Sequence, residues 1–263
     1  MYIDVHCHLN HKQFKDDLDE VIQRARAAGV KKIITAGVND LANRECIKLA
    51  EKYDIVECSV GAYPFDALNL QLYDPDEVGL SRHDKFDIDK EIEFWKKNKN
   101  KFIAIGEIGM DFSVKGYEEK QKENFRKLID VAIELDKPIV VHTRKAEREC
   151  VDILLNSDFP PRKVVLHCFG GRKSIIKDAV KAGMNFSIPP VITRLQHFET
   201  LVKLVPIDQL LTETDSPWLS PVKDERNEPA NVVFSIEKIA QIKGFTKEET
   251  MKTIFMNFQR IFL

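Results

Sequence analysis

The sequence predicts an α/β protein that folds as a (β/α)8 barrel, the TIM-barrel class. Short β-branched runs alternate with amphipathic helical patterns along the whole chain, and eight such pairs fit within its 263 residues. Polar side chains also gather where the apolar runs end, and the carboxyl ends of barrel strands are where this fold builds its active sites. A doubly wound open sheet is the structural alternative.

Eight runs have the length and composition of buried strands. In chain order they are residues 2–5, 32–36, 55–60, 102–105, 138–141, 163–166, 185–188 and a last run that begins at 209–211. Each is followed by a segment with helical spacing of its apolar residues. These segments are 14–28, 40–52, one ending at 91–98, one centred on 125–133, 146–155, one ending near 183, 195–204, and the pair 232–242 and 247–262.

Local signals support several of these helices. Gly29 follows the first helical segment, where a left-handed residue commonly ends a helix. Thr246 and Glu249 have the spacing of a capping box, which predicts the start of the last helix. The stretch 63–84 has no clear periodicity and is long for a loop, so we expect a lid or a specificity element there.

Composition indicates an ordinary globular protein of one domain, residues 1–263. The chain is 43% hydrophobic and 31% charged with a formal net charge of −2, so nothing global favours binding to nucleic acid or membranes. Its five cysteines form no C-x-x-C pair, and no run approaches the roughly 20 apolar residues that cross a bilayer. We expect a cytoplasmic protein with reduced thiols, no membrane association and no obligate protein partner.

The first strand ends in two histidines, His6 and His8. Side chains alternate along a strand, so these two point the same way and Cys7 points to the opposite face. Two neutral imidazoles can hold a divalent metal ion, but such a site needs further ligands. The rest of the chain must supply them.

Further metal-ligating side chains follow the later strands. They are Glu107 after the fourth, His142 after the fifth, His167 after the sixth and Asp215 after the eighth. Together with the first pair they would meet at the carboxyl end of the barrel. Six ligands are too many for one catalytic zinc ion with an open position, and they suit a site with two metal ions and a bridging carboxylate.

Each histidine also has a simpler interpretation. A single histidine at a strand end is more often a hydrogen-bonded structural residue than a ligand. The metal hypothesis depends on the joint pattern, because four of the seven histidines follow predicted strands. We expect His11, His83 and His197 to face solvent, and Cys7 and Cys168 to be small core residues.

Seven motifs carry a resemblance to a known family. They are IDVHCHL (3–9), GEIGMDF (106–112), KPIVVHTR (137–144), VVLHCFGG (164–171), FSIPPVITR (186–194), LLTETDSPWLSP (210–221) and RNEPANV (226–232). In these motifs and their order the chain resembles the TatD metal-dependent DNases of the amidohydrolase-like superfamily. The resemblance covers nearly the whole chain.

The resemblance implies a barrel of the metallo-dependent hydrolase type that binds two divalent ions, usually Mg²⁺ or Mn²⁺, with Zn²⁺ as the alternative. It implies that His6, His8 and Asp215 hold one ion and that His142 and His167 hold the second. The Glu107 carboxylate would bridge the two, and we count it with Asp215 as catalytic.

Other residues are candidates for catalysis and substrate binding. Asp215 could accept a proton from a metal-bound water as a general base. Arg144 and Arg226 are candidate phosphate clamps, since a guanidinium makes bidentate contacts, although each could equally be a solvated surface charge. Where TatD proteins usually read G-x-H-P, this chain has Tyr63, which can donate one hydrogen bond to a substrate but carries no positive charge.

Three functions remain open at this point. The first is an exonuclease-type deoxyribonuclease acting on DNA or small phosphodiesters. The second is hydrolysis of another ester or amide on the same metal pair, such as the ester of an aminoacyl-tRNA. The third is a binding protein without catalysis, which the complete ligand set disfavours because buried polar side chains are costly without a role.

Overall fold

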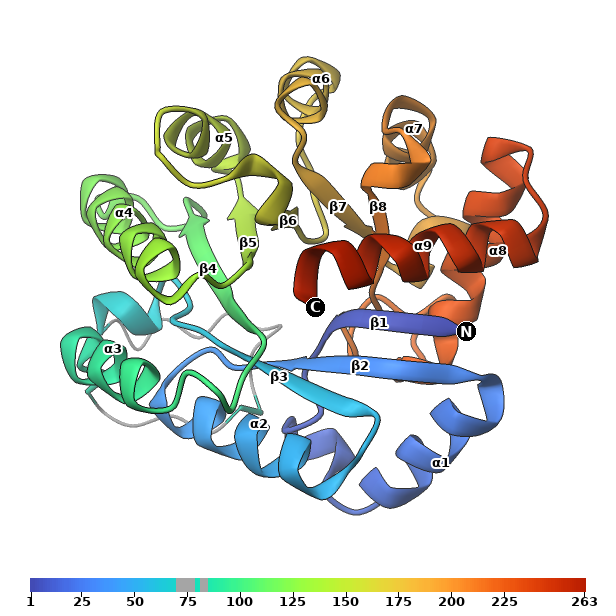
Figure 1. Ribbon diagram of the computed structural model, residues 1–263, viewed down its shortest axis with the longest axis horizontal. Helices are drawn as coiled ribbons and strands as arrows, with labels where there is room; N and C mark the ends of the chain where they lie inside the picture. Colours follow the sequence, from blue (N-terminus) through green and yellow to red (C-terminus); the bar gives the residue numbers. More distant parts are fainter. Residues whose placement is uncertain (70–78, 81–84) are drawn as a thin grey trace.

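Eight parallel strands form one sheet in the order β1 to β8 (Figure 1). This is a computed structural model, and it describes residues 1–69, 79–80 and 85–263. The strands are β1 (Tyr2–Cys7), β2 (Val30–Ala36), β3 (Val56–Val60), β4 (Ala104–Asp111), β5 (Ile139–Arg144), β6 (Val164–Leu166), β7 (Asn185–Ile188) and β8 (Leu210–Thr212). Sequential parallel order requires a crossover after every strand, which the alternating pattern predicted.

The sheet curls into a nearly closed barrel because its first and last strands meet. The Thr212 hydroxyl of β8 donates to the Ile3 carbonyl of β1 at 2.6 Å, and the backbone N–H of Asp215 donates to the His6 carbonyl at 2.8 Å. The predicted (β/α)8 barrel is therefore confirmed, and the open-sheet alternative is excluded.

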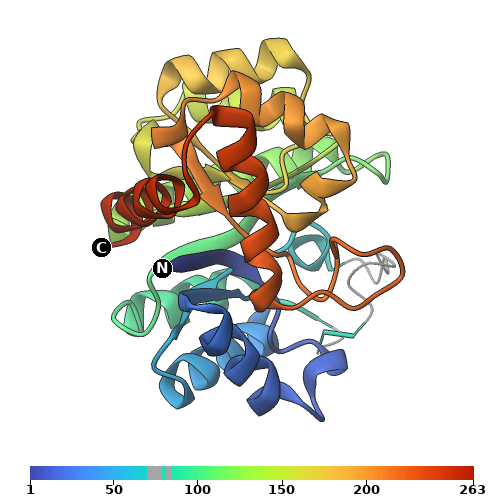
Figure 2. The ribbon, with the colours of Figure 1, turned by 90° about the vertical axis from the view of Figure 1, so that its right-hand side faces the viewer.

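Helices surround the strands (Figure 1). They are α1 (Leu18–Ala28), α2 (Asp40–Lys52), α3 (Ile88–Lys97), α4 (Glu118–Leu135), α5 (Glu147–Leu155), α6 (Lys173–Ala182), α7 (Gln196–Leu204), α8 (Val232–Lys243) and α9 (Lys247–Phe262). The last two cross at a steep angle, and the two chain ends lie on the same side of the molecule (Figure 2). The capping box at Thr246 and Glu249 is present as predicted.

Two apolar layers hold this arrangement. The larger lies between the strands and the helices around them. The smaller joins side chains from six strands to Phe258, Ile261 and Phe262 of α9. That helix thus packs on apolar ends of the strands, which leaves polar side chains free to gather at the opposite mouth.

Several predicted boundaries need correction. Strand β4 continues through Glu107 to Asp111, and β5 continues to Arg144, so the predicted ends fell several residues early. The first helix begins only at Leu18, because residues Lys12–Phe14 form a short 3₁₀ turn capped by His11. Most of the stretch predicted as a lid, residues 70–78 and 81–84, lies outside the described residues. In the part of the chain that is described, no helix combines the length and apolar character needed to span a membrane.

Candidate metal centre

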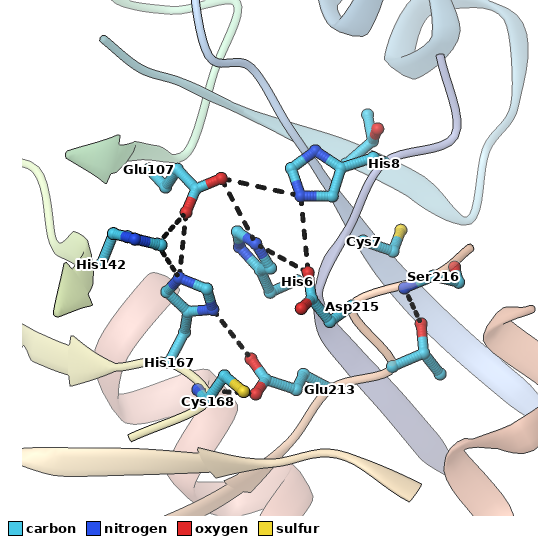
Figure 3. A network of polar contacts seen from close by, with 12 residues as sticks. His6, Cys7, His8, Glu107, His142, His167, Cys168, Glu213, Asp215 and Ser216 are labelled. Carbon is cyan, nitrogen blue, oxygen red and sulfur yellow. Dashed lines mark hydrogen bonds and ion pairs between the residues drawn. The ribbon is translucent and has the colours of Figure 1, made fainter. Parts of the chain in front are cut away.

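His6 of β1 and His8, one residue beyond that strand, point into the barrel mouth together. Nε2 of His6 and Nε2 of His8 each lie 3.5 Å from Oδ1 of Asp215 (Figure 3). Their rings meet edge to face at a centroid distance of 4.9 Å. Cys7 points the other way, where its buried thiol faces the carbonyl of Ile34 at 3.6 Å.

Glu107 lies between two groups of histidines. Its Oε1 is 4.0 Å from Nε2 of His6 and 3.7 Å from Nε2 of His8. Its Oε2 is 3.0 Å from both Nδ1 of His142 and Nε2 of His167 (Figure 3). Each carboxylate oxygen therefore faces a different pair of imidazoles.

The spacing of these donor atoms fits metal coordination. Two ligands about 2.1 Å from one ion lie roughly 3.0 Å apart at a right angle and about 3.4 Å apart at the tetrahedral angle. Three groups have donor atoms that all lie within 4.8 Å of one another: His6–His167–Asp215, His6–His8–Glu107 and Glu107–His142–His167. Nε2 of His6 is buried and has no hydrogen-bond partner within the described residues, as expected for an atom that holds a metal.

The electrostatics of the cluster also suit cations. Burial, with the neighbouring His167, lowers the pKa of His6 well below its usual value, so its ring is neutral. Burial opposes ionisation of Glu107, but contacts with His142 and His167 outweigh it and hold its pKa well below the ordinary value. Burial also opposes protonation of His142, yet the carboxylates of Asp111 and Glu107 raise its pKa to about 10. A metal ion would take the place of that proton.

Backbone contacts fix the position of Glu107. Its N–H donates to the Gly37 carbonyl at 3.1 Å, and its carbonyl accepts from Ala62 at 3.2 Å. A Cβ on Gly61 would lie 2.3 Å from the Gly37 oxygen and 2.5 Å from the Glu107 nitrogen, so only glycine allows this approach. Asn43 of α2 holds Gly61 on both sides, accepting from its N–H at 2.8 Å and donating to its carbonyl at 2.9 Å.

A buried aspartate places Asp215. Asp4 accepts from the Thr214 N–H at 2.9 Å with Oδ1 and from the Thr214 hydroxyl at 2.5 Å with Oδ2. Asp215 itself has a left-handed backbone with φ of 53°, which turns its side chain toward the histidines. Sequence reasoning missed Asp4, although it lies on the same alternating face as His6 and His8.

A second carboxylate missed from the sequence supports His167. Glu213 accepts from the Ser187 hydroxyl at 2.6 Å and from the Cys168 N–H at 2.8 Å, and it lies 3.8 Å from Nδ1 of His167. Burial raises its pKa to about 7. The prediction that Cys168 is a buried core residue holds only in part, because Cys168 packs against the core but is partly exposed and lines the cavity. Strand β6 ends at Leu166, so strand alternation does not reach Cys168, whose φ is 42°.

A cavity of about 640 Å³ opens over these side chains. Arg144, the last residue of β5, and Arg194, which follows the 3₁₀ turn Pro190–Thr193, line it. Trp218 forms part of its wall, edge-on to His8 at 5.2 Å. Arg194 also donates to the Ser220 carbonyl at 2.9 Å. It was missed from the sequence, where nothing but its place at the end of the motif 186–194 marks it.

Comparison with known proteins identifies the family. The sequence pattern described as "TatD related DNase" matches residues 3–263. The chain belongs to this family. It is thus a metal-dependent hydrolase, in agreement with the resemblance drawn from its motifs.

Individual relatives resemble the chain over almost its whole length. It is 34% identical to the human "Deoxyribonuclease TATDN3", covering 99% of this chain and 94% of that protein. It is 36% identical to an "Uncharacterized metal-dependent hydrolase" of Methanocaldococcus jannaschii (99% and 96%) and 28% identical to the "3'-5' ssDNA/RNA exonuclease TatD" of Erwinia tasmaniensis (98% and 98%). Among solved structures, the TatD homologue YJJV of Escherichia coli K12 superposes with a TM-score of 0.86 at 23% identity, covering 99% of this chain and 97% of that one. That likeness supports the fold.

One predicted phosphate clamp of this TatD-family chain lies elsewhere. Arg226 donates to both carboxylate oxygens of Asp17, at 2.8 and 2.5 Å, and to the Gln13 carbonyl at 2.5 Å, while its guanidinium covers the Phe14 ring. It is absent from the described cavity lining. Arg226 thus forms an ion pair that joins the loop after β8 to Asp17, the residue that precedes α1.

The histidines outside the cluster behave differently from one another. His197 is exposed, as predicted. His11 is buried, contrary to prediction, because its Nδ1 accepts from the Gln13 N–H and its ring packs edge-on against Trp218 at 5.2 Å. His83 lies outside the described residues.

Proposed function

We propose that this TatD-family protein hydrolyses phosphodiester bonds of DNA from a strand end, using two divalent ions, Mg²⁺ or Mn²⁺. The observation that carries the proposal is Glu107, whose two oxygens face separate histidine groups at 3.0–4.0 Å. His6, His8 and Asp215 would hold one ion, and His142 and His167 the other. A single ion would use only one side of this carboxylate.

Bound divalent ions would supply a water nucleophile near neutral pH and neutralise charge on the phosphate. Asp215 is placed to accept a proton from the attacking water. Burial opposes its ionisation, but His8 and His6 lower its pKa below the ordinary value, so it is an ionised base at neutral pH. Its side chain keeps 16% of its surface exposed toward the cavity.

Arginines at the mouth would position the substrate. Arg144 lies two residues after His142 and is exposed on the cavity lining, and Arg194 lies on the same lining. Guanidinium groups bind phosphate in a bidentate manner, so these two would hold phosphates on either side of the scissile bond.

The size of the cavity favours a strand end as substrate. A volume of about 640 Å³ lies in the range of sites for small ligands and would take a terminal nucleotide more readily than a duplex. The names of the human and Erwinia relatives, a deoxyribonuclease and an exonuclease on single strands, support the same substrate class.

The experiment that tests the proposal is a parallel turnover assay. Purified protein, stripped with chelator and reloaded with Mn²⁺ or Mg²⁺, is given linear and circular single-stranded DNA, bis(p-nitrophenyl) phosphate and aminoacyl-tRNA. We expect metal-dependent mononucleotide release from the linear strand and an intact circle. Full activity without metal would refute the metal centre. Cleavage of the circle would refute the exonuclease mode, and turnover confined to aminoacyl-tRNA would favour the ester-hydrolase alternative.

A further inference from the structure

Tyr63 lies behind the second histidine group and its hydroxyl is already engaged. It follows β3, lines the cavity wall and is only 1% exposed. Its hydroxyl donates to Oδ2 of Asp111 at 3.0 Å. A phenol has one proton to donate, so a Tyr63 hydroxyl directed at Asp111 has none left for a substrate phosphate.

Asp111 is held rigidly at the end of β4. Gln121 of α4 clamps its backbone, accepting from the Asp111 N–H and donating to its carbonyl, both at 2.7 Å. The Ser113 N–H donates to Oδ1 at 2.7 Å. Oδ2 is thus the oxygen that remains for side chains, and the carboxylate is fully buried.

Oδ2 of Asp111 lies behind the ring of His142, a predicted metal ligand. Oδ2 of Asp111 lies 3.7 Å from Nε2 of His142, whose Nδ1 is on the other side of the ring, 3.0 Å from Glu107. The Tyr63 ring also meets the His142 ring edge to face at 5.0 Å. At 3.7 Å, Oδ2 of Asp111 and Nε2 of His142 are in ion-pair range and beyond a direct hydrogen bond, and Nε2 of His142 has no hydrogen-bond partner within the described residues. A carboxylate in this place behind a ligating histidine favours the ring proton on the rear nitrogen and leaves the front lone pair for the metal.

We propose that Tyr63 is a positioning residue, which aims Asp111 at His142 and thereby presents Nδ1 of His142 to the metal ion shared with His167. This inference rests on the proposed metal centre and differs from the substrate-binding role predicted from the sequence. Loss of an outer partner of a metal ligand typically weakens metal binding about 10- to 100-fold.

Tyr63→Phe tests the proposal because it keeps the ring contacts and removes only the hydroxyl. Calorimetric titration of the metal-stripped protein with Mn²⁺ needs no substrate. We expect the dissociation constant of one of two binding events to rise about tenfold, the lower end of that range. The matched control is Tyr53→Phe, whose hydroxyl likewise donates to a carboxylate, Asp19, far from the centre; it should bind as wild type.

A double variant separates this role from general disruption. Tyr63→Phe should have little further effect in an Asp111→Asn background, because both changes act on the same contact with His142. If the two substitutions lower the Mn²⁺ affinity additively, Tyr63 does not act through Asp111 and the proposal is refuted. Unchanged Mn²⁺ affinity in Tyr63→Phe, with a raised KM for phosphodiesters, would overturn the proposal in favour of direct substrate binding. Wild-type protein that binds no Mn²⁺ would instead refute the metal centre itself.

Discussion

Replacing His8 with alanine is expected to remove one metal ion and leave the other. Nε2 of His8 lies 3.7 Å from Glu107 and 3.5 Å from Asp215, and its donor group includes neither His142 nor His167. His6 is a less selective target, since it belongs to two donor groups and stacks on the ring of His167 at 4.1 Å. His8 is therefore the residue that separates the two positions.

The expected magnitude follows from the number of ligands. Loss of a residue that supports a metal ligand lowers the affinity for the metal about 10- to 100-fold, so loss of a direct ligand should lower it at least about 100-fold. At free Mn²⁺ ten times the wild-type dissociation constant, occupancy of that position falls from ~91% to ~9% for a 100-fold loss. Metal content by mass spectrometry after dialysis at that concentration should drop by about one equivalent per chain.

The exposed His197 offers a matched control, because its Nε2 bonds to the Phe169 carbonyl at 2.8 Å and it belongs to none of the donor groups found among the described residues. His197→Ala should keep both equivalents. If His8→Ala also retains both ions, or loses both at once, the division of ligands around Glu107 is wrong.

Further outcomes are expected for single variants and for changes of pH. Asp215→Ala should lower kcat by at least about 100-fold, the usual contribution of a general base, with little change in thermal unfolding; retained turnover would remove Asp215 from that role. Arg144→Ala should raise KM for phosphodiesters, whereas Arg226→Ala should leave KM unchanged and lower the stability by less than about 1 kcal/mol, as for a surface ion pair. Because hydrogen bonding to Arg226 lowers the pKa of Asp17 from 3.8 to about 2, that stabilisation is present above pH 4 and lost as pH falls through 2, which acid unfolding of the two proteins would measure. Since contacts with Asp111 and Glu107 raise the pKa of His142 to about 10, Mn²⁺ binding at neutral pH should release a proton from this ring, and the apparent affinity should rise with pH; calorimetry in buffers of different ionisation enthalpy should detect the released proton.

The sequence predicted the barrel and the convergence of six polar side chains because both depend on local periodicity. His6 and His8 share a face through strand alternation alone, and parallel order brings the remaining strand ends to the same mouth. These rules need only the approximate position of each strand.

What the sequence did not reveal depends on contacts between distant segments. Asp111 lies 3.7 Å from His142 because β4 runs farther than its apolar stretch suggests. His11 packs against Trp218, which lies more than two hundred residues later in the sequence. Arg226 forms an ion pair with Asp17, which belongs to a different loop. A charge or a ring in the sequence shows what a residue can bind, and the fold decides which partner is nearest.

The backbone contacts that hold Glu107 limit which substitutions can alter this centre. Gly61 leaves no room for a side chain beside the Gly37 carbonyl and the Glu107 backbone, and Asn43 holds it there. The position of the Glu107 backbone is therefore set by how closely three neighbouring strands approach one another. In the proposed centre, exchanging other ligand side chains could alter which metal is preferred, while the bridging carboxylate would keep its place until the glycine itself is replaced.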